Sequence, residues 1–136
     1  GRLFASERNF GPTPGHRMWA RSLDNGNTFN SYGINKNLVT PVTKHWTGIV
    51  GAVSSMNQGQ KIAFASAASP DVRANLTIKT SSNGGDVWNT ALTVWSGPAG
   101  YVDMVPVGNI SGRLALLFEC GTSTFADYIG FSLVQL

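Results

Sequence analysis

The chain has a single cysteine among its 136 residues, so an internal disulfide framework is excluded. Charged residues make up only 12% of the sequence, whereas about 25% is usual in soluble domains. No apolar run reaches the ~18 residues of a membrane-spanning helix. The lysines and arginines are scattered and the net charge is only +3, which argues against a nucleic-acid partner. Single arginines in a pocket would instead suit an anionic small ligand.

Metal and redox chemistry have little support in the sequence. No His or second Cys stands at a metal-ligand spacing, so we expect no metal site and no cofactor. Cys120 follows an apolar segment and precedes Gly-Thr, a position typical of a small packing residue at a strand end. The chain opens on Gly1-Arg-Leu without a leading segment, which suggests a fragment or a processed chain. Glycosylation sequons at Asn75 and Asn109 favour a secreted or extracellular protein.

Short apolar segments bounded by Gly, Asn, Asp, Ser and Pro occupy most of the chain, and none has the periodicity of a helix. With 16 glycines and plentiful Thr, Ser, Val and Trp, this pattern predicts an all-β chain arranged as a meander. The segment 30–44 is expected to be a long irregular loop. The expected strands are Leu3–Ser6, Arg17–Ser22, Thr47–Ser54, Lys61–Ala67, Asn75–Thr80, Thr90–Trp95, Tyr101–Val107, Leu114–Glu119 and Tyr128–Val134.

One pattern occurs twice, in Ser22-Leu-Asp-Asn-Gly-Asn-Thr-Phe29 and in Ser81-Ser-Asn-Gly-Gly-Asp-Val-Trp88. Both copies have a Ser, an Asp or Asn, a Gly and an aromatic residue at the same spacing. The Asp or Asn side chain can accept backbone N–H groups, and Gly permits a positive φ, so each copy predicts a hairpin turn. The pattern resembles the Asp box of sialidases and other β-propellers, in which it has a structural role.

The resemblance implies an all-β, sialidase-like β-propeller, of which this chain contains about three blades of four-stranded antiparallel sheet. We expect the C-terminal part of the domain, divided into a partial blade (1–45), a full blade (46–100) and a last blade (101–136). Such a part has open sheet edges. We therefore expect a second chain, or the N-terminal part of the same protein, to complete the propeller.

Three arginines are candidates for binding a sugar carboxylate. Arg17 begins the segment that leads into the first repeat, and Arg73 precedes the segment that leads into the second. These segments resemble those that carry the second and third arginines of the sialidase triad. Arg8, in Ser-Glu-Arg-Asn, competes with Arg17 for the second position. Arginine suits the task because its planar guanidinium group forms two parallel charge-assisted hydrogen bonds with a carboxylate.

The remaining candidates are Tyr101, Glu119 and Trp46. The segment Ala99-Gly-Tyr-Val-Asp resembles the Ala-Tyr-Ser-Asp segment of sialidases, whose Tyr is the catalytic nucleophile. Here Gly100 replaces the usual Ala and Val102 replaces the usual Ser. The segment that ends on Glu119 resembles another sialidase segment, whose Glu orients the first arginine of the triad. The segment that contains Trp46 and the adjacent His45 has the position at which the family brings a loop to the pocket, so either residue could face the glycerol or acyl groups of a sugar. A role in packing is the alternative for both.

These resemblances imply part of an exo-sialidase that hydrolyses terminal sialic acids from glycoconjugates. A neutral Tyr nucleophile suits that substrate, because the carboxylate on its anomeric carbon repels an Asp or Glu, and such sialidases are an exception to the two-carboxylate rule of glycosidases. The first arginine of the triad, the acid/base Asp and the activating Glu are expected upstream of Gly1. Two alternatives stay open: a non-catalytic lectin-like propeller that binds sialylated glycans or another acidic sugar, and an Asp-box propeller that serves as a scaffold.

Overall fold

The computed structural model describes residues 2–9, 15–41 and 51–136, and the regular structure of this part of the chain is almost entirely β. This confirms the predicted fold class. The described residues include no helix long and apolar enough to cross a membrane. In chain order the elements are β1 (Leu3–Glu7), β2 (His16–Ser22), β3 (Ser31–Val39), β4 (Ala52–Met56), the 3₁₀ turn η1 (Asn57–Gly59), β5 (Lys61–Ala67), β6 (Ala74–Ser81), β7 (Asn89–Pro106), β8 (Arg113–Cys120) and β9 (Tyr128–Gln135).

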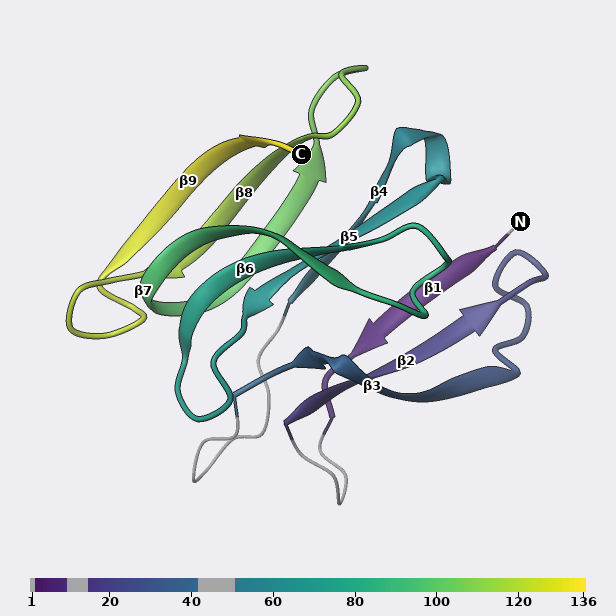
Figure 1. The fold of residues 1–136 in the computed structure, drawn as a ribbon, viewed down its shortest axis with the longest axis horizontal. Coiled ribbons are helices and arrows are strands. Elements are labelled where there is room, and N and C mark those ends of the chain that lie inside the picture. Colours follow the sequence, from purple (N-terminus) through teal and green to yellow (C-terminus); the bar gives the residue numbers. More distant parts are fainter. Residues whose placement is uncertain (1, 10–14, 42–50) are drawn as a thin grey trace.

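The strands form two antiparallel sheets, which Figure 1 shows side by side. One sheet has the order β1-β2-β3, and the other, which curls, has the order β4-β5-β6-β7-β8-β9. Within each sheet the neighbouring strands are consecutive in the chain, as expected for a meander. Strand β7 changes its partner along its length. Its residues up to Pro98 pair with β6, and those from Ala99 onward pair with β8. Register shifts in both pairings are of the kind that bends a strand and increases its twist.

Two details of the predicted strand pattern were wrong. The segment expected to be an irregular loop contains strand β3, and the two strands expected at 90–95 and 101–107 are parts of the single strand β7. In β3 only Asn35 and Leu38 are buried, so the strand lacks the apolar alternation by which strands are recognised. Strand β7 runs through the expected blade boundary at residue 100, and the division into blades stays a prediction.

The main hydrophobic core lies within the six-stranded sheet, where buried side chains come from all of its strands. A smaller cluster joins the two sheets: Leu38 of β3, Phe64 of β5 and Trp88, which immediately precedes β7. The Trp88 ring centroid lies 5.8 Å from that of Phe4 in β1 and 6.1 Å from that of Phe64. The amide of Asn35 adds a polar contact by donating a hydrogen bond to the Gly85 carbonyl (3.1 Å).

The first repeated pattern forms a tight turn between β2 and β3. Ser22 Oγ accepts the Gly26 N–H (2.8 Å) and donates to Asp24 Oδ1 (2.6 Å). Asp24 also accepts the Thr28 N–H (2.9 Å) and the Thr28 hydroxyl (2.7 Å). Gly26 has a φ of 91°, a conformation that favours glycine.

The second repeated pattern has the same geometry between β6 and β7. Ser81 Oγ accepts the Gly85 N–H (2.9 Å) and donates to Asn83 Oδ1 (2.8 Å), and Asn83 Oδ1 accepts the Val87 N–H (3.0 Å). Trp88 closes the turn by donating its indole N–H to the Gly85 carbonyl (2.9 Å). The repeat therefore has the structural role that its sequence predicts.

Candidate functional site

Arg8, Arg73 and Tyr101 line a single cavity of about 750 Å³. Three of the six predicted site residues thus come together from the β1–β2 connection, the β5–β6 connection and strand β7. The size is that of an ordinary small-molecule site. The other residues that line this cavity are Asp71, Val72, Ala74, Pro98, Ser123, Thr124 and Phe125.

Arg73 belongs to the β5–β6 connection and is held against β7. Its carbonyl accepts the Ala99 N–H (2.9 Å), which ties its backbone to the segment that carries Tyr101. Its Cζ atom lies over the Tyr101 ring, 5.3 Å from the centroid, and over the Phe125 ring at 4.6 Å. Contact between an aromatic ring and the face of a guanidinium group leaves the N–H groups at its rim available to an anion.

Glu119 supports the backbone of Tyr101. Its Oε2 atom accepts the Tyr101 N–H at 3.0 Å, and the Tyr101 side chain is 41% exposed. Gly100 makes the arrangement possible, because a Cβ atom at this position would collide with the Glu119 carboxylate and lie 2.9 Å from Cδ2 of Phe125. Glu119 is not among the residues that line the cavity. Its expected interaction with a first triad arginine stays a prediction.

Arg17 lies away from the cavity lining, inside the molecule. Its side chain is 3% exposed and donates hydrogen bonds to Ser6 Oγ (3.2 Å) and to the Ser6 carbonyl (3.0 Å). Its Cζ atom is 5.4 Å from the centroid of the Phe64 ring. Burial, and then the positive charge of Arg8, lower the pKa of Arg17 to about 10, against the opposing effect of Glu7. Geometry therefore favours Arg8 as the arginine that shares the cavity with Arg73, and a ligand-binding role of Arg17 stays a prediction.

Trp46 and His45 lie outside the described residues. Phe125, by contrast, is a cavity residue that the sequence analysis missed. It belongs to the β8–β9 loop, whose sequence Gly121-Thr-Ser-Thr-Phe-Ala-Asp127 indicates only a turn-rich segment. Its position against Arg73 becomes visible only in three dimensions.

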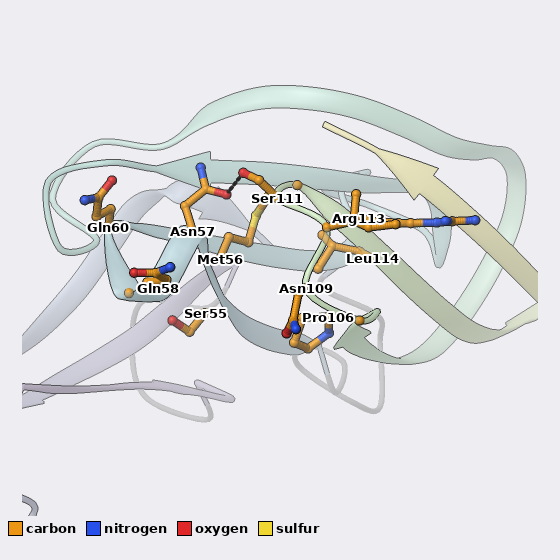
Figure 2. A pocket seen from close by; sticks show the side chains of 14 residues that line it. Ser55, Met56, Asn57, Gln58, Gln60, Pro106, Asn109, Ser111, Arg113 and Leu114 are labelled. Carbon is orange, nitrogen blue, oxygen red and sulfur yellow. Dashed lines mark hydrogen bonds between the residues drawn. The ribbon is translucent and has the colours of Figure 1, made fainter.

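A second cavity of about 680 Å³ lies where β7 ends, between the β4–β5 and β7–β8 turns (Figure 2). Its lining includes the amide residues Asn57, Gln58, Gln60 and Asn109, and the Ser111 hydroxyl donates a hydrogen bond to Asn57 Oδ1. Arg113 is the one charged residue of its lining. Because it lacks a pair of arginines and any aromatic ring, it is the weaker candidate for an acidic ligand. No group of three or more His, Cys, Asp or Glu side chains in the described part of the chain is arranged to hold a metal ion.

No family model matches the chain, but solved sialidase structures share its fold. A Hadza microbial sialidase superimposes with a TM-score of 0.70 at 20% identity, over 100% of this chain and 25% of that chain. The intramolecular trans-sialidase of Ruminococcus gnavus gives 0.73 at 18% identity, over 100% of this chain and 30% of that one. The intramolecular trans-sialidase of the leech gives 0.72 at 18% identity, over 99% and 22%.

The fold is thus that of part of a sialidase β-propeller. The chain spans only 22–30% of the length of these structures. The resemblance to sialidases drawn from the sequence is confirmed at the level of the fold.

Proposed function

We propose that this chain is part of an exo-sialidase, in which Arg8 and Arg73 bind the carboxylate of a terminal sialic acid and Tyr101 is the nucleophile. The observation that supports this most strongly is that these three side chains line one cavity. The similar structures add support, since they are a sialidase and two intramolecular trans-sialidases, one of them in complex with oseltamivir carboxylate.

The charges of the cavity suit an acidic sugar. The residues that line it include two arginines, Arg8 and Arg73, and one acidic residue, Asp71, so the lining carries a net positive charge. Guanidinium groups bind carboxylates through short charge-assisted hydrogen bonds. The apolar lining, from Val72, Pro98 and the Phe125 ring, supplies surface for the acyl and carbon-rich parts of such a sugar.

In the proposed reaction the Tyr101 oxygen forms a bond to the anomeric carbon while the glycosidic C–O bond breaks. The leaving oxygen takes a proton from an acid, and the phenol gives its proton to a base. Water then displaces Tyr101 and releases sialic acid. Glu119 contributes by holding the Tyr101 backbone in place through the 3.0 Å hydrogen bond.

The test is covalent trapping in the protein at its full natural length. A fluorinated sialyl donor should label Tyr101, as seen by peptide mass spectrometry, and a fluorogenic sialoside should be hydrolysed. Tyr101→Phe is the matched variant, because it removes only the hydroxyl and keeps the ring under Arg73.

This variant should lose labelling and turnover but still bind sialic acid. Turnover by Tyr101→Phe at the wild-type rate, or a label on another residue, would contradict the role of Tyr101. A wild-type protein that binds sialic acid without turnover would be a lectin.

A further inference from the structure

The loop between β8 and β9 is folded around the carboxylate of Asp127. Asp127 Oδ2 accepts the N–H groups of Thr122, Ser123 and Thr124 at 3.0, 2.9 and 3.0 Å. The Thr124 hydroxyl donates to Asp127 Oδ1 (2.6 Å) and accepts the Ala126 N–H (3.2 Å). The Thr124 hydroxyl, and then the backbone N–H groups, lower the pKa of Asp127 to about 2. The carboxylate that organises the loop is therefore charged at every physiological pH.

The base of this loop is tied to the segment that holds Arg73. The Gly121 N–H donates to the Pro98 carbonyl (3.1 Å), and the next residue, Ala99, donates its N–H to the Arg73 carbonyl (2.9 Å). A Cβ atom on Gly121 would collide with the Thr124 carbonyl and the Asp127 carboxylate. The loop fold therefore depends on a glycine at its start as well as on the aspartate at its end.

The loop presents Phe125 to Arg73. The Phe125 ring centroid is 4.6 Å from Arg73 Cζ, closer than that of Tyr101 at 5.3 Å. The ring also lies beside Gly100, with its Cδ2 atom 2.9 Å from the position of a Cβ atom on that residue. Arginine carries a large rotamer entropy, which is lost when its side chain becomes fixed on a ligand. An aromatic ring against the guanidinium group reduces this loss, because it orients the group before the ligand arrives.

We propose that Phe125 is a positioning residue for Arg73 and that Asp127 folds the loop that presents Phe125. Through this loop the protein sets its affinity for the anionic sugar. The proposal rests on the proposed function, since the ligand is the carboxylate that Arg73 binds there. It assigns to the β8–β9 loop a role in substrate affinity, and it makes the Phe125 contribution dependent on the planar guanidinium group of Arg73.

A double-mutant cycle in the full-length protein tests this, with N-acetylneuraminic acid as the probe in calorimetric titrations. Phe125→Leu should weaken binding by about 3–30-fold, the range of a cation–π contact. With the fluorogenic sialoside as substrate, this variant should raise KM more than it lowers kcat. Phe125→Tyr should bind like the wild type because it keeps the ring. Arg73→Ala leaves neither a cation nor a planar group for the Phe125 ring to orient. In that background Phe125→Leu should cost less than twofold. Equal losses in both backgrounds, or no loss in Phe125→Leu, would overturn the proposal.

A second readout needs no sugar. In NMR spectra the Arg73 Nε–Hε signal should carry a ring-current shift that decreases in Phe125→Leu, where the Tyr101 ring alone remains near the guanidinium group, and that persists in Phe125→Tyr. Asp127→Ala should also reduce this shift, whereas Ser123→Ala should not, because only the backbone N–H of Ser123 contacts Asp127.

The two readouts separate this proposal from the proposed function. A wild-type protein that binds no sialic acid but shows these shifts refutes the function and keeps the positioning of Arg73. A sialic-acid-binding protein in which Phe125→Leu changes neither the affinity nor the Arg73 signal refutes the positioning alone.

Discussion

Gly100 leaves room for two side chains that support the candidate site. The Glu119 carboxylate and the Phe125 ring both lie too close to the position of a Cβ atom on residue 100 for a side chain to fit there. Glu119 uses this position to accept the Tyr101 N–H. The glycine that replaces the usual alanine of the sialidase segment is thus part of how this chain places Tyr101.

We predict that Gly100→Ala weakens sialic acid binding and destabilises the protein by about 1–3 kcal/mol, the usual cost of overpacking a buried position. The side chains of Glu119 and Phe125 must move aside, so the Tyr101 N–H should also exchange faster with solvent. Titration calorimetry, urea unfolding and hydrogen exchange measure the three effects. Gly33→Ala is the matched control, since its Cβ atom would meet Trp19 at an ordinary 3.4 Å. Wild-type binding and stability in Gly100→Ala would contradict the prediction.

The choice between Arg8 and Arg17 shows what the sequence can tell at the scale of one residue. Both arginines stand near the first repeat, and the sequence favoured Arg17 because it begins the strand that leads there. Only the fold shows that Arg17 is buried against Ser6 and Phe64, whereas Arg8 lines the cavity. Strand position was predictable, but the direction of a long side chain depends on packing between the two sheets.

At the scale of elements, the two repeated turns form a natural comparison. They share their hydrogen bonds, but the first turn has a carboxylate at Asp24 and the second a neutral amide at Asn83. The Ser22 and Thr28 hydroxyls lower the pKa of Asp24 to about 2, against about 3.9 in an unfolded chain. A carboxyl group whose pKa is depressed on folding stabilises the folded state above the unfolded value, and that contribution is lost as the pH falls towards the folded value.

We therefore predict that the first turn loosens between about pH 4 and pH 2 and the second does not. Protection factors from hydrogen exchange should fall for the Thr28 N–H over this interval but stay level for the Val87 N–H. Asp24→Asn should remove the difference, because it gives the first turn the chemistry of the second. A wild-type protein in which both amides respond alike to acid would contradict this account of the turns.

Strands β3 and β7 could not be predicted correctly from the sequence. The turns were predictable because their chemistry is local and repeats in the chain. Strand β3 has no alternation of apolar residues to reveal it, because only Leu38 and Asn35 are buried at the contact between the sheets. Strand β7 was predicted as two strands because Gly97-Pro98 is typical of a strand end. The strand in fact continues through these residues, and its pairing partner changes there from β6 to β8.

At the scale of the whole molecule, the outer face around β9 exposes apolar side chains. Phe131 is 69% exposed and is paired across the sheet with Leu117, itself 54% exposed. Ile129 and Leu133 of β9 extend this face at 67% and 45%. Strand β9 also lies at the edge of its sheet. Exposed apolar patches and unpaired edges are where further protein packs, or where chains aggregate.

We predict that the 136-residue chain made alone associates or aggregates, whereas a longer form that completes the propeller is a stable monomer. Size-exclusion chromatography with light scattering measures this directly. Phe131→Lys and Leu117→Lys should reduce self-association of the isolated chain, because they place charges on this face. A well-folded monomer of 14.5 kDa with a cooperative melting transition would contradict the prediction.

The central claim is that the cavity of Arg8, Arg73 and Tyr101 binds a sugar through its carboxylate. Calorimetric titration of the full-length protein with N-acetylneuraminic acid and with its methyl ester tests it most directly, since the two ligands differ in that one charge. The wild type should prefer the acid by at least about tenfold, as expected for charge-assisted hydrogen bonds, and Arg73→Ala should lose most of this preference. Equal affinity for the acid and the ester in the wild type would contradict the claim.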